Sequence, residues 1–444
     1  MLAPVTATGT FLGPQPLTKR ASAPPVTVSG NAFWRGTTRF YVRGIDYQPG
    51  GASAMRDPLA DKSVCERDLA QFRKLGINTV RVYTVDNSAP HDECMRLLAD
   101  AGTYVVVDAN NPLYSLDRLD PAASYNAAYL RSVFATVDAF ARYDNTLAFL
   151  SGNEVVNDRP ETAAAARYVK AVTRDIRRYL RARGHRAVPV GYSAADVAQT
   201  RMQMAWYMNC GPEEERSDFF AFNDYSWCNS DFVTAGWDQK VKNFTGYGIP
   251  IFLSEYGCNT NGRDFGEMAA LMSGKMTSVY SGGVMYEYSL EENGYGIVKI
   301  PDPRGSVIEE QADFAKLAKA LRMYPPPPGD GGFTRTTHAV ACPTADAGWL
   351  VDTQSLPAMP AKAEEYMANG AGPGPGLSGK GSQNAGDGTE DGEATSGSGA
   401  VGPSPTESKN EAGNMNVNLD SVEITPVIFG VLLVICSLTM SFSL

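Results

Sequence analysis

Runs of consecutive apolar residues alternate along this chain with segments in which apolar residues recur at the period of a helix. Uninterrupted apolar runs are typical of strands buried on both faces of a parallel sheet. The runs predict strands at residues 40–46, 79–83, 104–108, 147–154, 188–192, 219–225, 251–257 and 283–288. The helical periods predict helices at residues 63–75, 92–101, 126–143, 162–183 and 309–323.

Strands that alternate with helices leave two α/β architectures, an open doubly wound sheet and a closed barrel. An open sheet of this class usually carries a glycine-rich phosphate loop after its first strand. Here the first strand ends at residues 46–51 in Asp-Tyr-Gln-Pro-Gly-Gly, which lacks that pattern. The eight predicted strands fit a (β/α)8 TIM barrel better. We therefore predict an α/β fold with a barrel domain at residues 28–325.

The composition of the flanking segments changes sharply. Residues 326–369 are predicted to form an extension packed on the barrel, whereas residues 370–413 are rich in Gly, Ser, Pro and polar residues and predict a disordered spacer. Residues 1–27 lack the basic start and apolar core of a signal peptide. Either they form a disordered arm of a chain that is not secreted, or the biological start lies elsewhere. The C-terminal segment favours the second alternative, because it indicates the secretory route.

Residues 414–444 end in an apolar tail that begins at Pro426 and has no basic residue after it. Membrane-spanning anchors usually carry a basic cytosolic flank. Small residues, a polar spacer and a terminal apolar tail are instead typical of a glycosylphosphatidylinositol (GPI) attachment signal, with Asn410, Gly413 and Asn414 as candidate sites. We predict a lipid-anchored protein on the extracellular face of the plasma membrane, retained there or moved to the cell wall. An ordinary tail anchor is the alternative.

Charge and cysteine content exclude several classes of partner. The net charge of −10 argues against nucleic acid and against anionic membrane surfaces, and it suits a neutral substrate. None of the seven cysteines forms a CxxC pair or lies beside a histidine, so we predict no metal and no organic cofactor. Without Cys436 in the tail, six cysteines remain, which suits disulfides in an oxidising compartment. Asn243 begins a sequon for N-glycosylation.

Polar residues gather where the predicted strands end, which in a TIM barrel is the mouth that carries the active site. These residues are Asp46, Gln48, Tyr83, Asp108, Asn110, Asn153, Glu154, Tyr192, Asp224, Tyr225, Glu255, Tyr286 and Tyr288. The set contains carboxylates, amides and phenols, and the three histidines (His91, His185 and His338) are expected on the surface. Amides and acids bind sugar hydroxyls, and aromatic faces stack on sugar rings. The mouth is therefore predicted to bind a carbohydrate.

Glu154 and Glu255 would carry the chemistry. A buried carboxylate at a strand end is costly unless it has a function, although either residue taken alone could be a salt-bridged structural residue. Like charges held close raise the pKa of one partner, so that one glutamate acts as the acid and the other as the nucleophile. A separation of ~5–5.5 Å would predict retention of the anomeric configuration.

Several stretches of the chain resemble the fungal β-1,3-glucanosyltransferases of glycoside hydrolase family 72, which are GPI-anchored enzymes that elongate wall glucan. The resembling stretches are residues 43–51, 75–83, 91–95, 151–155, 189–193, 223–228, 253–259 and 280–283. They include Ser-Gly-Asn-Glu-Val at residues 151–155 and Leu-Ser-Glu-Tyr-Gly-Cys-Asn at residues 253–259. Agreement covers roughly residues 28–325.

The resemblance implies a role for each site residue. Glu154 resembles the acid/base and Glu255 the nucleophile, and Asn153 resembles the residue that holds the sugar 2-hydroxyl. Donor-site contacts are implied for Gln48, Tyr83, Asp108, Tyr225 and Tyr286, and an acceptor-side contact for Tyr295. The implied disulfides are Cys65–Cys94, Cys228–Cys258 and Cys210–Cys342. The cysteine-rich second module of some family members is missing here, because only Cys436 follows Cys342.

We therefore predict a monomeric, retaining β-1,3-glucanosyltransferase with β-1,3-glucan chains as donor and acceptor. It would cleave one glucan and join the fragment to the non-reducing end of another. One alternative is a hydrolytic β-1,3-glucanase that uses the same two glutamates. A non-catalytic glucan-binding adhesin is the alternative of another class, and the presence of both glutamates argues against it.

Overall fold

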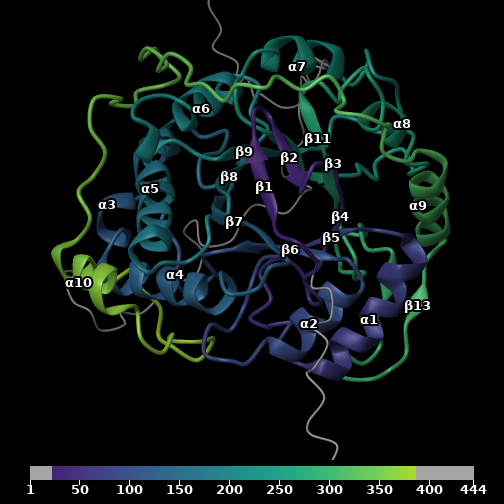
Figure 1. Cartoon of the computed structure of the whole chain (residues 1–444), viewed down its shortest axis with the longest axis horizontal. Coiled ribbons are helices and arrows are strands. Elements are labelled where there is room, and N and C mark those ends of the chain that lie inside the picture. Colours follow the sequence, from purple (N-terminus) through teal and green to yellow (C-terminus); the bar gives the residue numbers. More distant parts are fainter. Residues whose placement is uncertain (1–22, 387–444) are drawn as a thin grey trace, which may run out of the picture. The chain divides into compact units, whose positions relative to one another are not determined.

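Eight parallel strands close into a barrel, and helices surround it (Figure 1). The computed structural model describes residues 23–386. The barrel strands are β4 (Val42–Asp46), β5 (Thr79–Val82), β6 (Tyr104–Asp108), β7 (Thr146–Asn153), β8 (Val190–Ala195), β9 (Phe219–Asp224), β10 (Ile251–Tyr256) and β11 (Tyr280–Met285). Each strand pairs with its neighbour in chain order, and β11 closes the ring on β4. The predicted (β/α)8 TIM barrel is confirmed.

The helices around the barrel include short ones that the sequence pattern missed. They are α1 (Lys62–Leu75), α2 (Asp92–Asp100), α3 (Pro121–Ser124), α4 (Ala127–Phe140), α5 (Ala166–Ala182), α6 (Arg201–Met208), α7 (Trp237–Phe244), α8 (Glu267–Leu271), α9 (Ala312–Met323) and α10 (Ala361–Asn369). Short elements are η1 (Pro160–Ala165), η2 (Glu213–Glu215), β12 (Val298–Lys299) and β13 (Glu309–Glu310). Helices α6, α7 and α8 were not predicted, because eight residues or fewer give little periodic signal.

The eighth strand lies three residues earlier than the sequence predicts, at 280–285 rather than 283–288. The predicted strand begins at Gly283 and leaves out residues 280–282. In the structure Gly282 has a φ of +89°, and a Cβ there would lie 2.0 Å from the carbonyl oxygen of Val42 in β4. Only glycine allows this close approach. Tyr286 and Glu287 therefore lie beyond the strand, at the mouth of the barrel.

A small antiparallel sheet packs against the amino-terminal ends of the barrel strands. It consists of β1 (Val26–Ser29), β2 (Ala32–Arg35) and β3 (Thr38–Phe40). The Phe33 ring lies 5.7 Å from Phe219 and 6.0 Å from Phe252, both near the starts of their strands. Strand β1 begins at Val26, before the predicted domain boundary at residue 28, and β1 and β2 bury apolar side chains against the barrel interior.

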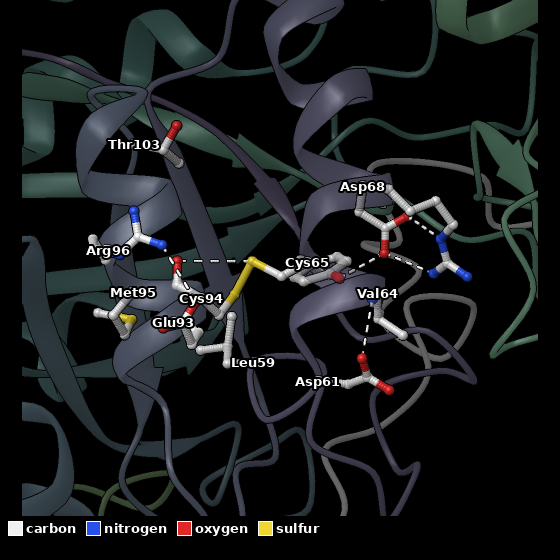
Figure 2. Close-up of a disulfide and its surroundings, with 12 residues drawn as sticks. Leu59, Asp61, Val64, Cys65, Asp68, Glu93, Cys94, Met95, Arg96 and Thr103 are labelled. Atoms are coloured by element: carbon white, nitrogen blue, oxygen red, sulfur yellow. Dashed lines mark hydrogen bonds and ion pairs between the residues drawn. A yellow bond between two sulfur atoms is a disulfide. The ribbon is translucent and has the colours of Figure 1, made fainter.

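Helix α1 has clear start and stop signals. The Asp61 side chain accepts hydrogen bonds from the backbone N–H groups of Ser63 and Val64, and Gly76 ends the helix at a φ of 76°. Figure 2 shows the disulfide Cys65–Cys94, which joins α1 to α2. The other two disulfides are Cys228–Cys258 and Cys210–Cys342, so the structure contains the three pairs that the resemblance implies.

Asp68 ties α1 to the mouth of the barrel. Its buried carboxylate accepts hydrogen bonds from the Tyr47 hydroxyl at 2.6 Å and the Tyr288 hydroxyl at 2.8 Å, and it pairs with Arg67. Tyr47 follows β4 and Tyr288 follows β11. The first and last segments of the mouth are thus fixed to one carboxylate.

The prediction that all three histidines lie on the surface is wrong for His91. This ring is 1% exposed, packs against Phe140 and pairs through Nε2 with Asp57 at 2.6 Å. His91 precedes α2 directly, and a polar residue at a helix start gave no sequence signal of burial.

Residues 326–369 run along the barrel. The backbone of Thr334 exchanges hydrogen bonds with Asn31, the ring of Trp349 packs on Tyr207, and α10 lies beside α4 and α5 (Figure 1). The Cys210–Cys342 bond links this extension to the segment after α6.

Composition predicts a disordered spacer at residues 370–413, and this prediction is wrong for residues 370–386. The N–H of Gly376 donates to Asn87 Oδ1 at 2.9 Å, and the N–H of Ser382 donates to the carbonyl of Leu113 at 3.0 Å. Asn126 Nδ2 donates to the carbonyl of Ser382 at 2.7 Å. Hydrogen bonds of its own backbone groups thus fix this segment in place, although it has few apolar side chains to bury.

The predicted lipid-anchor signal, its candidate sites and Cys436 lie outside the described residues. Within residues 23–386, no helix combines the length and apolar character that a membrane span requires.

Removing the Cys210–Cys342 bond should lower stability. Replacing both cysteines with alanine opens a loop of 132 residues, and we expect a loss of about 2–5 kcal/mol in the free energy of unfolding. Thermal melting by circular dichroism measures the change. The Cys228–Cys258 pair, separated by 30 residues, is the comparison and should cost less. An unchanged melting temperature in the first variant would contradict the expectation.

Candidate active site

All nine predicted catalytic and substrate-binding residues lie at the carboxyl-terminal ends of the barrel strands or in the loops that follow them. They are Gln48, Tyr83, Asp108, Asn153, Glu154, Tyr225, Glu255, Tyr286 and Tyr295. Hydrogen bonds and ring contacts, some of them through Arg81 and Asn223, link eight of these residues into one cluster. Gln48 is bound to backbone groups of neighbouring loops.

Arg81, in β5, is the centre of this cluster, and the sequence analysis did not single it out. The guanidinium is fully buried and donates to both carboxylate oxygens of Asp108 at 3.1 Å. It also donates to Glu255 Oε1 at 3.1 Å and to Asn153 Oδ1 at 3.0 Å. An arginine inside an apolar strand is costly without partners, and that cost was the signal that could have revealed it.

Glu255 is surrounded by donors. The Tyr83 hydroxyl donates to its Oε1 at 2.7 Å, and the Tyr225 hydroxyl donates to its Oε2 at 2.6 Å. Burial raises the pKa of Glu255 above its ordinary value, whereas Arg81 and the two hydroxyls act in the opposite direction. Charged and neutral donors on both oxygens favour the ionised form, which is the form that attacks an anomeric carbon.

Glu154 has a contrasting environment. Its Oε1 accepts a hydrogen bond from Asn223 Nδ2 at 2.7 Å, and its buried Oε2 has no partner within residues 23–386. Burial, and then the charge of Glu255, raise the pKa of Glu154 to about 8. This shift of the pKa favours the protonated carboxyl group near neutral pH, and Oε2 is its oxygen without a hydrogen-bond partner within residues 23–386.

The backbone at Glu154 is strained. Its φ of 47° lies in the left-handed region, which few residues other than glycine adopt. Its N–H donates to the carbonyl of Ser193 at 2.8 Å, and its carbonyl accepts from Arg118 at 3.0 Å. Such strain persists only where the surroundings enforce it, and it is frequent at active sites.

A network of amides and hydroxyls connects the two glutamates. Asn153 Oδ1 accepts hydrogen bonds from Arg81, from the Ser193 hydroxyl at 2.7 Å and from Asn223 Nδ2 at 3.2 Å. Its oxygen is thus engaged inside the protein, and its NH2 group is the end that a ligand would meet. Asn223 and Ser193 were not among the predicted site residues, although Asn223 directly precedes the strand-end pair Asp224 and Tyr225.

Three tyrosines form an aromatic cluster beside Glu255. The ring of Tyr295 lies 5.6 Å from Tyr225 and 5.6 Å from Tyr286, and the last two rings lie 6.3 Å apart. The disulfide Cys228–Cys258 contacts the same cluster. The rings meet edge to face, at interplanar angles of 74–83°, and all three are buried.

A pocket opens beside the cluster. Tyr83, Asp108 and Asn153 line it together with Asn110, Asn111 and Ser115. Neither glutamate lines this pocket, so it extends the site to one side of the reacting centre. The Ser115 hydroxyl in the pocket wall accepts a hydrogen bond from Gln383 Nε2 at 3.3 Å. Gln383 lies in the segment that follows α10.

Gln48 does not present a free amide to the site. Its Nε2 donates to the carbonyls of Ala54 and Arg56, and its Oε1 accepts from the N–H of Thr84. In this structure it therefore holds the loop after β4 against the loop after β5.

The chain is similar to known proteins over most of its length. The sequence model of the glucanosyltransferase family, glycoside hydrolase family 72, matches residues 16–324. The chain is 58% identical over 367 residues to the 1,3-beta-glucanosyltransferase gel1 of Aspergillus fumigatus, which covers 82% of this chain and 80% of that protein. It is 48% identical over 358 residues to the 1,3-beta-glucanosyltransferase GAS5 of Saccharomyces cerevisiae, with coverage of 79% and 73%.

A solved structure has the same fold. It is Saccharomyces cerevisiae Gas2p in complex with laminaritetraose and laminaripentaose, with a TM-score of 0.71, 36% sequence identity and coverage of 77% of this chain and 76% of that chain. Barrel, site and sequence lead to one assignment: this chain belongs to the glucanosyltransferase family, glycoside hydrolase family 72.

Proposed function

We propose that this chain is a retaining β-1,3-glucanosyltransferase that cleaves a β-1,3-glucan and transfers the fragment to the non-reducing end of another. The observation that carries the proposal is the contrast between the two glutamates. Glu154 is held protonated with one free oxygen, whereas Glu255 is bound by Arg81 and two tyrosine hydroxyls. The names of the relatives supply the substrate class.

The first step breaks the donor glucan. A Glu255 oxygen attacks the anomeric carbon and forms a glycosyl ester, while the bond from that carbon to the glycosidic oxygen breaks. Glu154 gives its proton to the departing oxygen, so the leaving glucan ends in a hydroxyl group. The NH2 group of Asn153 would bind the 2-hydroxyl of the reacting sugar. Tyr83, Asp108 and Tyr286 would contact the donor chain.

The second step joins the fragment to an acceptor. Glu154, now ionised, removes the proton from the 3-hydroxyl of an acceptor glucan, whose oxygen attacks the anomeric carbon and releases Glu255. Water in the same position would give hydrolysis instead. An acceptor bound against Tyr295 favours transfer, because it raises the effective concentration of the hydroxyl group and occupies the space that water needs.

Product sizing tests the proposal. The purified protein would be incubated with a single reduced laminari-oligosaccharide, and the products separated by length. A transferase makes chains longer than the starting material. A hydrolytic glucanase makes only shorter chains, and a non-catalytic adhesin leaves the substrate unchanged, so either result would overturn the proposal.

The activity should fall on the alkaline side of the pH profile. Glu154 acts in its protonated form, so the rate should be full below its pKa of about 8 and fall as the pH rises through that value. Glu255 must be ionised, and its raised pKa sets the acidic limb. The dependence of kcat/KM on pH measures both limbs. A rate that stays constant up to about pH 10 would contradict the role of Glu154.

We infer that the protein acts as a monomer on the extracellular face of the plasma membrane, held by a GPI anchor or moved from it to the wall. The apolar C-terminal tail supports this location, and the exposure of Asn243 on the last turn of α7 supports the predicted N-glycosylation there. Treatment of intact cells with a phosphatidylinositol-specific phospholipase should release the protein. Retention on the cells after this treatment and after glucanase digestion would contradict the anchor.

A further inference from the structure

The loop after β11 carries Tyr295, and the backbone of this residue is fixed on both sides. Its N–H donates to Asn293 Oδ1 at 3.0 Å, and its carbonyl accepts from Arg263 Nη2 at 2.7 Å. The side chain is 3% exposed. The position of the Tyr295 ring is therefore set by neighbouring polar groups as well as by ring packing.

Asn293 is in turn held by Glu287. Asn293 Nδ2 donates to Glu287 Oε1 at 2.7 Å, and its carbonyl accepts from Asn259 Nδ2 at 3.4 Å. Glu287 is 1% exposed and takes part in neither step of the proposed reaction. A buried carboxyl group is costly unless its polar atoms are engaged, and the Asn293 amide engages one oxygen of Glu287.

A second contact holds the same loop at its start. Glu291 Oε1 accepts hydrogen bonds from the Ser289 hydroxyl at 2.7 Å and from the N–H of Gly50 at 2.8 Å. Gly50 belongs to the loop after β4, so the two loops are joined across the mouth. Glu287 and Glu291 thus hold the loop through two separate contacts, and both residues precede the turn that leads to Tyr295.

We propose that Glu287 and Asn293 are positioning residues that hold Tyr295 in place for the acceptor and thereby set the ratio of transfer to hydrolysis. The inference rests on the proposed function. Its physical basis is that Glu287 holds Asn293, and Asn293 holds the backbone of Tyr295. Asn293 Nδ2 also lies 3.5 Å from the Tyr286 hydroxyl, to which it donates. The contacts of Glu154 and Glu255 with Asn223, Arg81, Tyr83 and Tyr225 involve neither Glu287 nor Asn293. Loosening Tyr295 therefore weakens acceptor binding and leaves donor cleavage intact.

The variant Asn293→Ala tests this inference directly. At a fixed acceptor concentration, we expect the ratio of transfer to hydrolysis to fall about tenfold and the acceptor concentration for half-maximal transfer to rise by a similar factor. The kcat of donor cleavage should stay within about twofold of the parent. Radiolabelled laminari-oligosaccharide as donor and an unlabelled one as acceptor give both rates in one assay.

Three further variants separate positioning from general damage. Glu287→Gln keeps an oxygen that accepts from Asn293 and should behave as the parent. Glu287→Ala removes that oxygen, leaves Asn293 in the chain and should lower the ratio of transfer to hydrolysis. It takes the place of Asn293→Ala as the test if Asn293→Ala does not fold. Glu292→Ala is the matched control, because Glu292 is exposed in the same loop, and it should change nothing.

The outcomes distinguish this inference from the function on which it rests. If the parent protein makes no product longer than its substrate, the proposed function fails and the inference fails with it. If the parent transfers glucan and Asn293→Ala or Glu287→Ala keeps the parental ratio, the inference alone is wrong. An equal loss of cleavage and transfer would also overturn it, because that result describes a merely structural role.

Discussion

Replacing Glu255 with glutamine should abolish glycosyl transfer and hydrolysis together, with a fall in kcat of about 10⁵-fold. The amide is too weak a nucleophile to form the glycosyl ester, and no other ionised oxygen within residues 23–386 is held by both Arg81 and two tyrosine hydroxyls. Binding of a laminari-oligosaccharide, measured by calorimetry, should be retained because the variant keeps the shape of the site.

Glu154→Gln is the informative partner of that variant. It removes the proton donor, and we expect a fall of about 10²–10⁴-fold with glucan as donor. A donor with a good leaving group, such as an aryl glycoside, needs no protonation, so it should restore the first step in Glu154→Gln and fail to do so in Glu255→Gln. Turnover of glucan within tenfold of the parent in either variant would refute the assignment of the two glutamates.

Replacing Arg81 with methionine should lower both stability and activity. The change leaves the carboxylates of Asp108 and Glu255 buried without their cation. We expect destabilisation of about 3–5 kcal/mol, because breaking a buried ion pair leaves an uncompensated charge. The pKa of Glu255 should rise further once the cation that lowers it is lost, so the acidic limb of the pH profile should move to higher pH.

Arg81→Lys tests geometry separately from charge. Lysine retains the positive charge but not the planar group that reaches Asp108, Asn153 and Glu255 together, and we expect a partial loss of kcat with a smaller shift of the acidic limb. Arg73→Lys, at an exposed position on α1, is the control and should be silent. Parental kcat in Arg81→Met would contradict the role of this residue.

The barrel and both glutamates were predictable because each leaves a local signal in the sequence. Strands buried on both faces appear as apolar runs, and an acid at the end of such a run is conspicuous. Arg81 escaped because the strand was read for its apolar neighbours. The predicted start of β11 was three residues late, because Gly282 fits a close approach to Val42 in β4, which is distant in the sequence. Such a contact exists only when the two strands pair.

Residues 370–386 show the opposite limit of composition. A segment rich in glycine and proline predicts a spacer, yet its backbone is bound by Asn87, Leu113 and Asn126. The capacity of those partners to bind a backbone is not visible in the segment itself. Glu287 and Asn293 were missed for a related reason, since the network that joins them forms only after the chain has turned back at the mouth.

The Cys210–Cys342 bond has a practical consequence for anyone who purifies this protein. A protease that nicked the chain anywhere between these two cysteines would leave two pieces joined through sulfur. Electrophoresis without a reductant would then show a single band of full mass, and the damage would appear only after thiol treatment. Integrity of a preparation is therefore judged on reducing gels.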